Sequence, residues 1–283
     1  MADGVSLVLA YEPLIRLGAF AAVFFGLAAL ELSVPRRRRA VPIAWRWPNN
    51  LSLAAVNTLA ARVVFPTAAV GVAVIAQERG WGLLNSVDLS VGLRIAIAIL
   101  VLDLALYIQH VMFHKVPVLW RLHRVHHADL DVDVTTGIRF HPLEILLSMA
   151  IKTGCVVALG APAVAVVAFE VLLNAASLFN HANAKLPAAL DRLLRLLIVT
   201  PDMHRIHHSV RPDETNSNFG FQVPWWDRLF GTYRADPADG HDGMAIGLAA
   251  FRDPALLRLD RMLLQPFTEP AEAGSGSRRD GGS

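Results

Sequence analysis

Long apolar stretches constrain this chain more than any other feature. Three of them, about residues 14–32, 51–76 and 91–113, are each long enough to cross a membrane once. A helix rises about 1.5 Å per residue, so roughly 20 apolar residues span a hydrocarbon core of about 30 Å. The composition agrees, because only 18% of the residues are charged, against about a quarter in soluble domains. The chain is therefore predicted to be an integral membrane protein.

A fourth apolar region, residues 143–179, is too long for one crossing, since a single helix of that length would extend about 55 Å. The sequence Gly-Ala-Pro at residues 160–162 interrupts it with a turn signal. We therefore expect a helical hairpin that returns the chain to the side it came from. The predicted fold is all-α: a membrane bundle of about three single spans plus the hairpin, with a cytoplasmic helical cap that carries a histidine cluster.

The orientation follows from basic residues after the first span. Four consecutive arginines, Arg36 to Arg39, and then Arg46 place this loop in the cytoplasm by the positive-inside rule. The third span then ends on the cytoplasmic side, and the hairpin keeps all later histidine groups there. We expect a multi-pass protein of a bacterial cytoplasmic membrane, because the chain is short, rich in Ala and Arg, and shows no retention signal.

The remaining features of the sequence concern the domain bounds, the cap and the net charge. We expect one membrane-embedded domain over residues 1–266, with a histidine-rich core at 94–233, and a disordered Gly/Ser-rich tail over 267–283. Two amphipathic stretches, residues 186–199 and 254–267, suit either helices at the membrane surface or packing helices of the cap. A net charge of only +2 gives no general attraction to nucleic acid.

Histidine spacing carries the chemistry. Eight of the eleven histidines fall into an HxxxH group and two HxxHH groups. Residues three and four apart share one helix face, so each group can present its rings together. Neutral imidazole suits iron, zinc, copper or nickel, and eight rings are too many for one ion, so the pattern predicts two metals close together. The groups are His110 and His114; His123, His126 and His127; and His204, His207 and His208.

The sequence lacks the motifs that several other classes of metalloenzyme require. The chain has no HExxH motif, no deaminase-type cysteine pair and no Glu-x-x-His pairs, and Cys155 is its only cysteine. An all-nitrogen site for two metals beside lipid is suited to O2 activation and C–H oxidation. Two alternatives stay open: a histidine-based membrane metal transporter or sensor, and a zinc-dependent lipid hydrolase. His241 is isolated in a loop and is expected to be structural.

The order of these groups resembles the fatty acid hydroxylase/sterol desaturase superfamily, and the similarity extends over residues 94–233. It includes the blocks DLALYIQHVMFH, LWRLHRVHH, TGIRFHPLE, FNHAN, TPDMHRIHHS and TNSNFGFQVPWWDRLFGTY, in this order. The resemblance implies a non-haem di-iron oxygenase that hydroxylates or desaturates a fatty acyl, sterol, carotenoid or ether lipid. It implies two iron ions, O2 as co-substrate, and electrons from a separate ferredoxin or cytochrome-like donor.

The resemblance also implies the ligands: the eight grouped histidines and His181 of FNHAN. Some relatives have a further histidine where this chain has Lys185. An ammonium does not bind iron, so water, Asn180 or Asn183 is expected to complete that metal's ligands.

Two further positions have two interpretations each. Asp103 lies two helical turns before His110 and could accept a ligand N–H or pair with Arg62. His141, with Arg139 and Glu144 in RFHPLE, could support the site or cap the helix that begins at Pro142.

Overall fold

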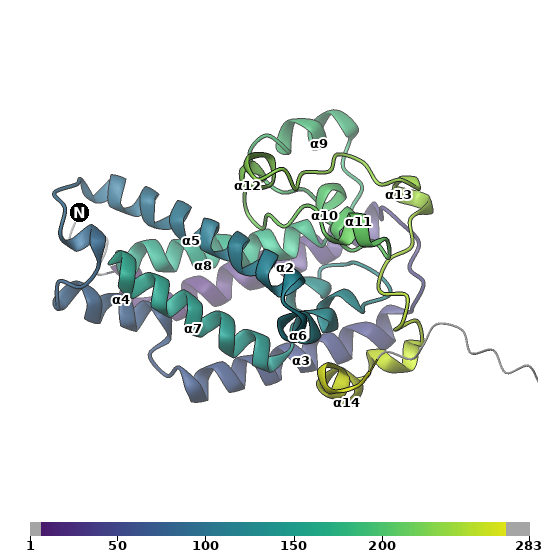
Figure 1. Ribbon diagram of the computed structural model, residues 1–283, viewed down its shortest axis with the longest axis horizontal. Coiled ribbons are helices and arrows are strands. Elements are labelled where there is room, and N and C mark those ends of the chain that lie inside the picture. Colours follow the sequence, from purple (N-terminus) through teal and green to yellow (C-terminus); the bar gives the residue numbers. More distant parts are fainter. Residues whose placement is uncertain (1–6, 270–283) are drawn as a thin grey trace, which may run out of the picture.

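The computed structural model describes residues 7–269, and this part of the chain is helical, with two isolated β-bridges and no strand. Six longer helices form a bundle whose members run along the long axis of the molecule (Figure 1). They are α2 (Glu12–Ser33), α3 (Ile43–Val64), α4 (Ala68–Glu78), α5 (Val91–Lys115), α7 (Pro142–Leu159) and α8 (Ala163–Asn180).

Short elements gather at one end of the bundle and form what we call the cap, residues 117–141 and 181–269 (Figure 1). One further short helix, η1 (Leu83–Asn85), lies in the loop before α5. The cap contains α6 (Pro117–His127), η2 (Thr136–Ile138), α9 (Ala188–Leu194), α10 (Pro201–His207), α11 (Pro212–Thr215), α12 (Trp225–Leu229), α13 (Gly240–Gly243), η3 (Pro254–Leu257), α14 (Leu259–Leu264) and η4 (Gln265–Phe267).

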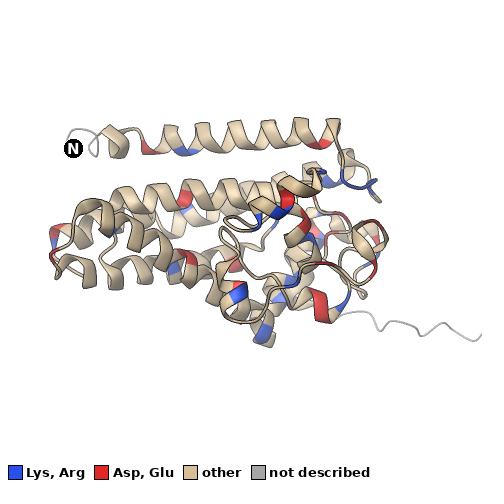
Figure 2. Ribbon diagram, turned by 90° about the horizontal axis from the view of Figure 1, so that it is seen from above, with Lys and Arg blue, Asp and Glu red and all other residues tan. Residues whose placement is uncertain are grey.

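Five helical segments are long and apolar enough to cross a membrane, which makes this a multi-pass integral membrane protein. Their outer surface is apolar: Phe25, Leu59 and Val63 are 66–72% exposed, as expected for side chains that contact lipid. Charged residues are sparse along the middle of the long helices and gather in the cap (Figure 2). The predicted bundle of single spans plus a hairpin is confirmed.

The hairpin is formed by α7 and α8. Gly160 ends α7 in the left-handed conformation at φ +68°, and Pro162 directly precedes α8. The core between α4, α5, α7 and α8 contains small residues such as Ala69, Ala73 and Ala165. Small side chains let membrane helices approach closely, since van der Waals packing is the main attraction between them.

The second span differs from the predicted helix over 51–76. Its first helix, α3, begins eight residues earlier at Ile43, and the segment breaks at residues 65–67 before α4. Pro66 explains the break, because proline lacks an N–H and its ring clashes with the preceding turn. The two amphipathic stretches are also less helical than expected: α9 has only seven residues, and 254–267 divides into η3, α14 and η4. Residues 270–283 of the predicted tail lie outside the described residues.

Arg46 lies inside the protein rather than at the surface that the positive-inside rule suggested. Its guanidinium is fully buried and binds Asp129 through two contacts of 2.8 and 2.7 Å, and Asp133 at 2.5 Å. Burial by itself would raise the pKa of Asp129, but the charges of Arg46 and Arg139 outweigh it and lower that pKa to about 2. This pairing fixes α3 against the loop that follows α6.

The loop before α5 packs against the hairpin turn at Gly82. A Cβ added there would lie 2.1 Å from the backbone nitrogen of Gly160. Gly80, two residues earlier, also has a positive φ but has open space around it. The Gly80→Ala change is expected to cost about 1–2 kcal/mol of backbone strain. Gly82→Ala should cost a further ~1–3 kcal/mol from overpacking. Thermal unfolding in detergent micelles measures both, and equal melting temperatures would contradict the close packing of the two turns.

Candidate metal centre

Nine histidines converge at the junction of the bundle and the cap, in two adjoining sets. Within each set, one ring nitrogen from every histidine lies within 4.8 Å of the others. The five-histidine set contains His110, His114, His123, His127 and His207, and the four-histidine set contains His126, His181, His204 and His208. Both HxxHH groups therefore divide between the two sets. Every histidine that the resemblance indicated is present in one of them.

Helix ends position these rings. His110 and His114 lie at the end of α5, the HRVHH group ends α6, and His181 directly follows α8. The last group lies on α10 and its C-cap, and Thr200 fixes the start of α10 by accepting a hydrogen bond from the Met203 amide. The centre thus takes residues from four helices, which only the folded hairpin and cap bring together.

In the five-histidine set, three rings donate a hydrogen bond outward from Nδ1. His110 donates to the carbonyl of Phe219 and His207 to that of Ser217, each at 2.7 Å, and His123 lies 2.6 Å from a carboxylate oxygen of Glu144. Carbonyl and carboxylate oxygens can only accept, so each of these rings carries its proton on Nδ1. The Nε2 lone pairs consequently point inward.

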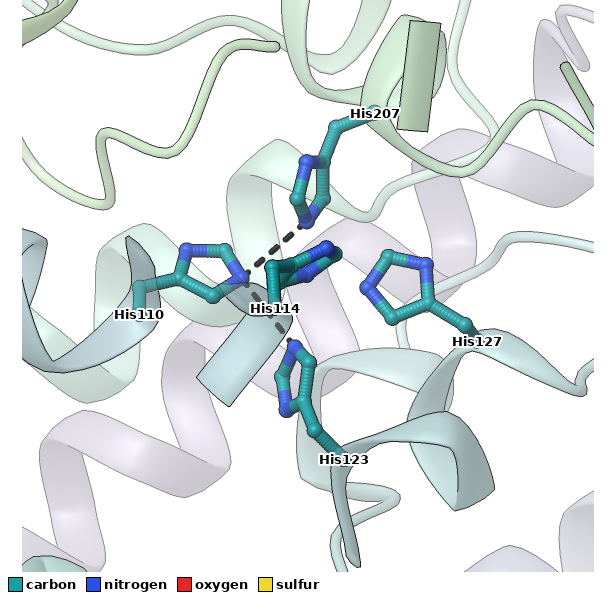
Figure 3. A group of neighbouring side chains, drawn as sticks. All are labelled: His110, His114, His123, His127 and His207. Atoms are coloured by element: carbon teal, nitrogen blue, oxygen red, sulfur yellow. Dashed lines mark hydrogen bonds between the residues drawn. The ribbon is translucent and has the colours of Figure 1, made fainter. Parts of the chain in front are cut away.

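The inward nitrogens lie very close together. Nε2 of His110 is 3.1 Å from Nε2 of His123 and 3.0 Å from Nε2 of His207 (Figure 3). The four-histidine set repeats this arrangement: His126 and His181 donate from Nδ1 to the carbonyls of Arg139 and Ser177. Nε2 of His181 then lies 3.1 Å from Nε2 of both His126 and His204.

Facing lone pairs at this distance repel one another unless a cation lies between them. At a metal–nitrogen distance of about 2.1 Å, two ligands at right angles are about 3.0 Å apart. The observed separations therefore fit nitrogens that share a metal ion. Further ring nitrogens of His114, His127 and His208 are buried without a hydrogen-bond partner among the described residues, as ligand atoms aimed at a metal would be.

The imidazoles outside the membrane spans also have lowered pKa values, which favour the neutral form that binds metals. Burial, reinforced by neighbouring imidazoles, lowers the pKa of His207 to about 3. Burial likewise lowers the pKa of His181 to about 4 and holds the pKa of His126, His204 and His208 well below the ordinary value. The imidazoles are therefore neutral at physiological pH, which is the form that ligates metals.

His141 and Glu144 have different roles. His141 caps α7 by accepting a hydrogen bond from the Leu143 amide, and its other nitrogen contacts the carbonyl of Leu263. It belongs to neither histidine set, so the expectation that it contributes to the cofactor site is corrected in favour of the helix cap. Glu144, in contrast, reaches back from α7 and orients His123.

Asp103 does not contact a histidine among the described residues. Its carboxylate accepts a 2.8 Å hydrogen bond from the indole N–H of Trp226 and so connects α5 to α12. The alternative ion pair with Arg62 is also not formed in the described part of the chain. The sequence pattern assigned this aspartate to the cofactor site because it could not show that α12 packs beside it.

The asparagines and Lys185 are placed differently from one another. Asn180 donates to the carbonyl of Phe221, and its own oxygen is buried without a partner among residues 7–269. Asn183 exchanges hydrogen bonds with the backbone of Arg37 and joins the loop after α2 to the cap, so it is not available to complete a ligand set. The side chain of Lys185 is exposed to solvent rather than turned toward the histidines.

Backbone carbonyls are the supporting groups that the sequence analysis missed. Ser217 and Phe219, which accept from His207 and His110, flank Asn218 at φ +52°, a conformation that Asn tolerates well. Asp227 accepts hydrogen bonds from the amides of Phe219 and Gly220, each at 2.8 Å, and holds this turn in place. The NSNFG block and the aspartate that follows were the available signal, although carbonyl roles leave no side-chain signature.

Comparisons with known proteins cover this same region. The chain is 29% identical over 144 residues to an ornithine lipid hydroxylase, OlsE, of Rhizobium tropici; the match covers 51% of this chain and 43% of that protein. It is 28% identical over 142 residues to the alkylglycerol monooxygenase of Homo sapiens, covering 49% and 30% of the two chains. The alkylglycerol monooxygenase of Danio rerio is 29% identical over 150 residues, covering 48% and 30%.

The chain thus spans less than half the length of these relatives. No solved structure matches it. The model of the fatty acid hydroxylase family matches residues 95–232, a segment that contains all nine histidines of the two sets. This match covers just under half of the chain, so the histidine-bearing segment is similar to the fatty acid hydroxylase family.

Proposed function

We propose that the protein is an integral-membrane oxygenase that hydroxylates a C–H bond of a membrane lipid, with two iron ions held by the nine histidines. The observation that supports this most strongly is the convergence of inward Nε2 atoms 3.0–3.1 Å apart in both sets. The relatives named above are a lipid hydroxylase and alkylglycerol monooxygenases. Their names favour oxygen insertion over desaturation, and a polar membrane lipid as substrate.

The donor set suits a redox-active metal. Imidazole binds iron, copper, nickel and zinc, but zinc has no redox chemistry. When bound, the two metal ions would supply the activation of O2. The chain's own residues hold the rings in one tautomer through the outward Nδ1 bonds, and they exclude water by burying the centre. Insertion of one oxygen atom from O2 into a C–H bond forms an alcohol and water and consumes two electrons and two protons, so a separate ferredoxin or cytochrome-like donor is required.

A cavity inside the bundle offers a place for the lipid chain. It has a volume of about 220 Å³ and lies between α2, α5, α7 and α8. Its lining is mostly apolar and includes Leu106 and Met149, but it also contains the ion-paired Arg16, Lys152 and Glu170. Two other lining residues are sequence neighbours of the centre: Gln109 precedes His110, and Ile145 follows Glu144. An acyl chain held there would lie in the membrane beside the histidines.

The basic loop supports a cytoplasmic position for the centre. Arg36 pairs with Asp202 of α10 at 3.1 Å, so the arginine-rich loop and the histidines are on the same side of the membrane. By the positive-inside rule that side is the cytoplasm, here of a bacterial cell. Small soluble electron donors are then able to reach the cap.

Isotopically labelled O2 tests the reaction itself. Membranes that contain the protein, supplied with a reductant and a total lipid extract, should form a lipid that carries one labelled oxygen atom. Membranes prepared without the protein serve as the control. Activity that persists without O2 and that, in a parallel reaction in labelled water, takes its oxygen from water would instead identify the zinc-dependent hydrolase. Metal uptake without any lipid product would identify the transporter.

One histidine from each set tests the ligands. His207→Ala and His126→Ala should each remove about one of two irons per chain and abolish the hydroxylated product, because each substitution opens a different set. Metal analysis of the purified protein measures the iron. The matched control is His241→Ala, a histidine outside both sets, which should keep both irons. Two irons and unchanged product in both ligand variants would contradict the proposal.

Glu144 offers a test of ring orientation that does not depend on activity. Glu144→Leu removes the acceptor for His123 and should weaken metal binding in the five-histidine set about 10–100-fold. Glu144→Gln keeps an oxygen acceptor and should weaken it less. The four-histidine set is the internal control, because its rings make no contact with Glu144. Competition with a metal chelator should therefore release one iron early and the other at the wild-type concentration. Simultaneous release of both would point to a general loss of structure.

A further inference from the structure

The cap has an exposed apolar surface that the reaction proposed above does not use. We call it the apolar edge; it comprises Leu190, Leu193, Leu196, Leu197, Ile198, Trp225, Leu229 and Phe230, which are 38–68% exposed. Two hydrogen bonds join the segment after α9 to α12. The indole of Trp225 donates to the carbonyl of Leu196 at 2.8 Å, and Arg228 donates to the carbonyl of Arg195. Figure 1 shows α9 and α12 standing out beside the bundle at the cap end.

The contacts of α12 fix the depth of this edge relative to the membrane. Trp226 donates to Asp103, and the ring of Phe230 stacks on Tyr107 with centroids 5.4 Å apart. Asp103 lies twelve residues from either end of α5, or about 18 Å along the helix. Because α5 crosses the membrane, an element beside its middle lies at the level of the lipid tails.

A large basic cavity adjoins the apolar edge. Its volume is about 720 Å³, and its lining contains five cationic side chains and three carboxylates. Two of the cations are paired, Arg36 with Asp202 at 3.1 Å and Arg195 with Asp191 at 2.7 Å. The other three, Lys185, Arg192 and Arg228, form no ion pair within residues 7–269. The cavity therefore has an excess of positive charge directly beside residues that enter the lipid.

From these two features we propose that the cavity binds the headgroup of an anionic phospholipid from the leaflet on the histidine side, with its acyl chains against the apolar edge. In and directly after α9, basic residues alternate with apolar ones: Arg192 precedes Leu193, and Arg195 precedes Leu196. The same segment therefore contributes to both the cavity and the apolar edge. Arginine and lysine are the usual ligands of phosphate oxygens. A small soluble anion would account for the charge but not for the exposed leucines. This lipid is separate from the substrate, and its binding does not depend on the reaction proposed above.

Lipid titration of the full-length protein in dodecyl maltoside micelles tests this site. The probes are dioleoylphosphatidylglycerol and dioleoylphosphatidylcholine, which share acyl chains and differ in headgroup charge, together with free glycerol 3-phosphate. The rise in melting temperature with lipid concentration gives an apparent Kd for each probe. Phosphatidylglycerol should bind at least about fivefold more tightly than phosphatidylcholine, the factor that one cation near an anionic headgroup contributes. Glycerol 3-phosphate should bind far more weakly than phosphatidylglycerol.

Paired variants separate the cavity from general surface charge. The double variant Lys185→Gln/Arg192→Gln should lose about thirtyfold in affinity for phosphatidylglycerol, since each cation contributes a factor of about five. The matched control, Arg258→Gln/Arg261→Gln, removes two exposed arginines next to and within α14 and should bind as the unmodified protein does. Leu193→Gln/Leu197→Gln should weaken both phospholipids and leave glycerol 3-phosphate unchanged.

Three results would overturn the proposal. They are equal affinity for the two phospholipids, an equal loss in the cavity and control variants, and binding of glycerol 3-phosphate as tight as that of phosphatidylglycerol. The last result would assign the cavity to a soluble phosphorylated compound. Because none of the substituted residues belongs to the histidine sets, unchanged iron content in every variant confirms that each is folded.

Discussion

The convergence of neutral imidazoles is the constraint on which the rest of this structure depends. Lone pairs 3.0–3.1 Å apart repel, so the rings must be held in place by the groups behind them. Those groups come from separate segments: the carbonyls of Ser217 and Phe219, the carboxylate of Glu144, and the carbonyls of Arg139 and Ser177. The histidine centre therefore exists only when α7, α8 and the 217–219 turn have all folded, so any metal bound there would be coupled to the fold of the whole molecule.

A second set of polar contacts keeps this centre at the membrane boundary. Arg46 and Asp129 form a buried pair behind the HRVHH group, and Asp103 and Trp226 connect a membrane helix to the cap. Buried charges of this kind are costly unless fully paired, so each pair fixes a specific arrangement of the cap on the bundle. The result is a cap that encloses the largely buried histidines at the end of the bundle and leaves its apolar edge exposed.

Much of the function could be predicted from the sequence because it depends on spacing along single helices. Apolar lengths identified the spans, and the Gly-Ala-Pro turn identified the hairpin, since a chain of 37 apolar residues cannot cross a bilayer once. The HxxxH and HxxHH groups indicated two metals, because residues three and four apart share a helix face. The interruption at Pro66 was missed although proline is a local signal for a helix break. The short α9 was missed because tertiary packing, which sequence periodicity does not report, decides where a marginal helix ends.

By itself, then, the sequence determined the membrane bundle, the nine histidines and the similarity of residues 95–232 to the fatty acid hydroxylase family. Only the tertiary structure decided how the histidines divide into five and four, because that depends on how α6 and α10 face each other across the centre. It also showed that His141, Asp103 and Asn183 lie outside the two histidine sets. Each instead contacts a residue far away in the chain: Leu263, Trp226 and Arg37, respectively. Such partners carry no local signal, since the contact energy arises between segments whose proximity the sequence pattern does not encode.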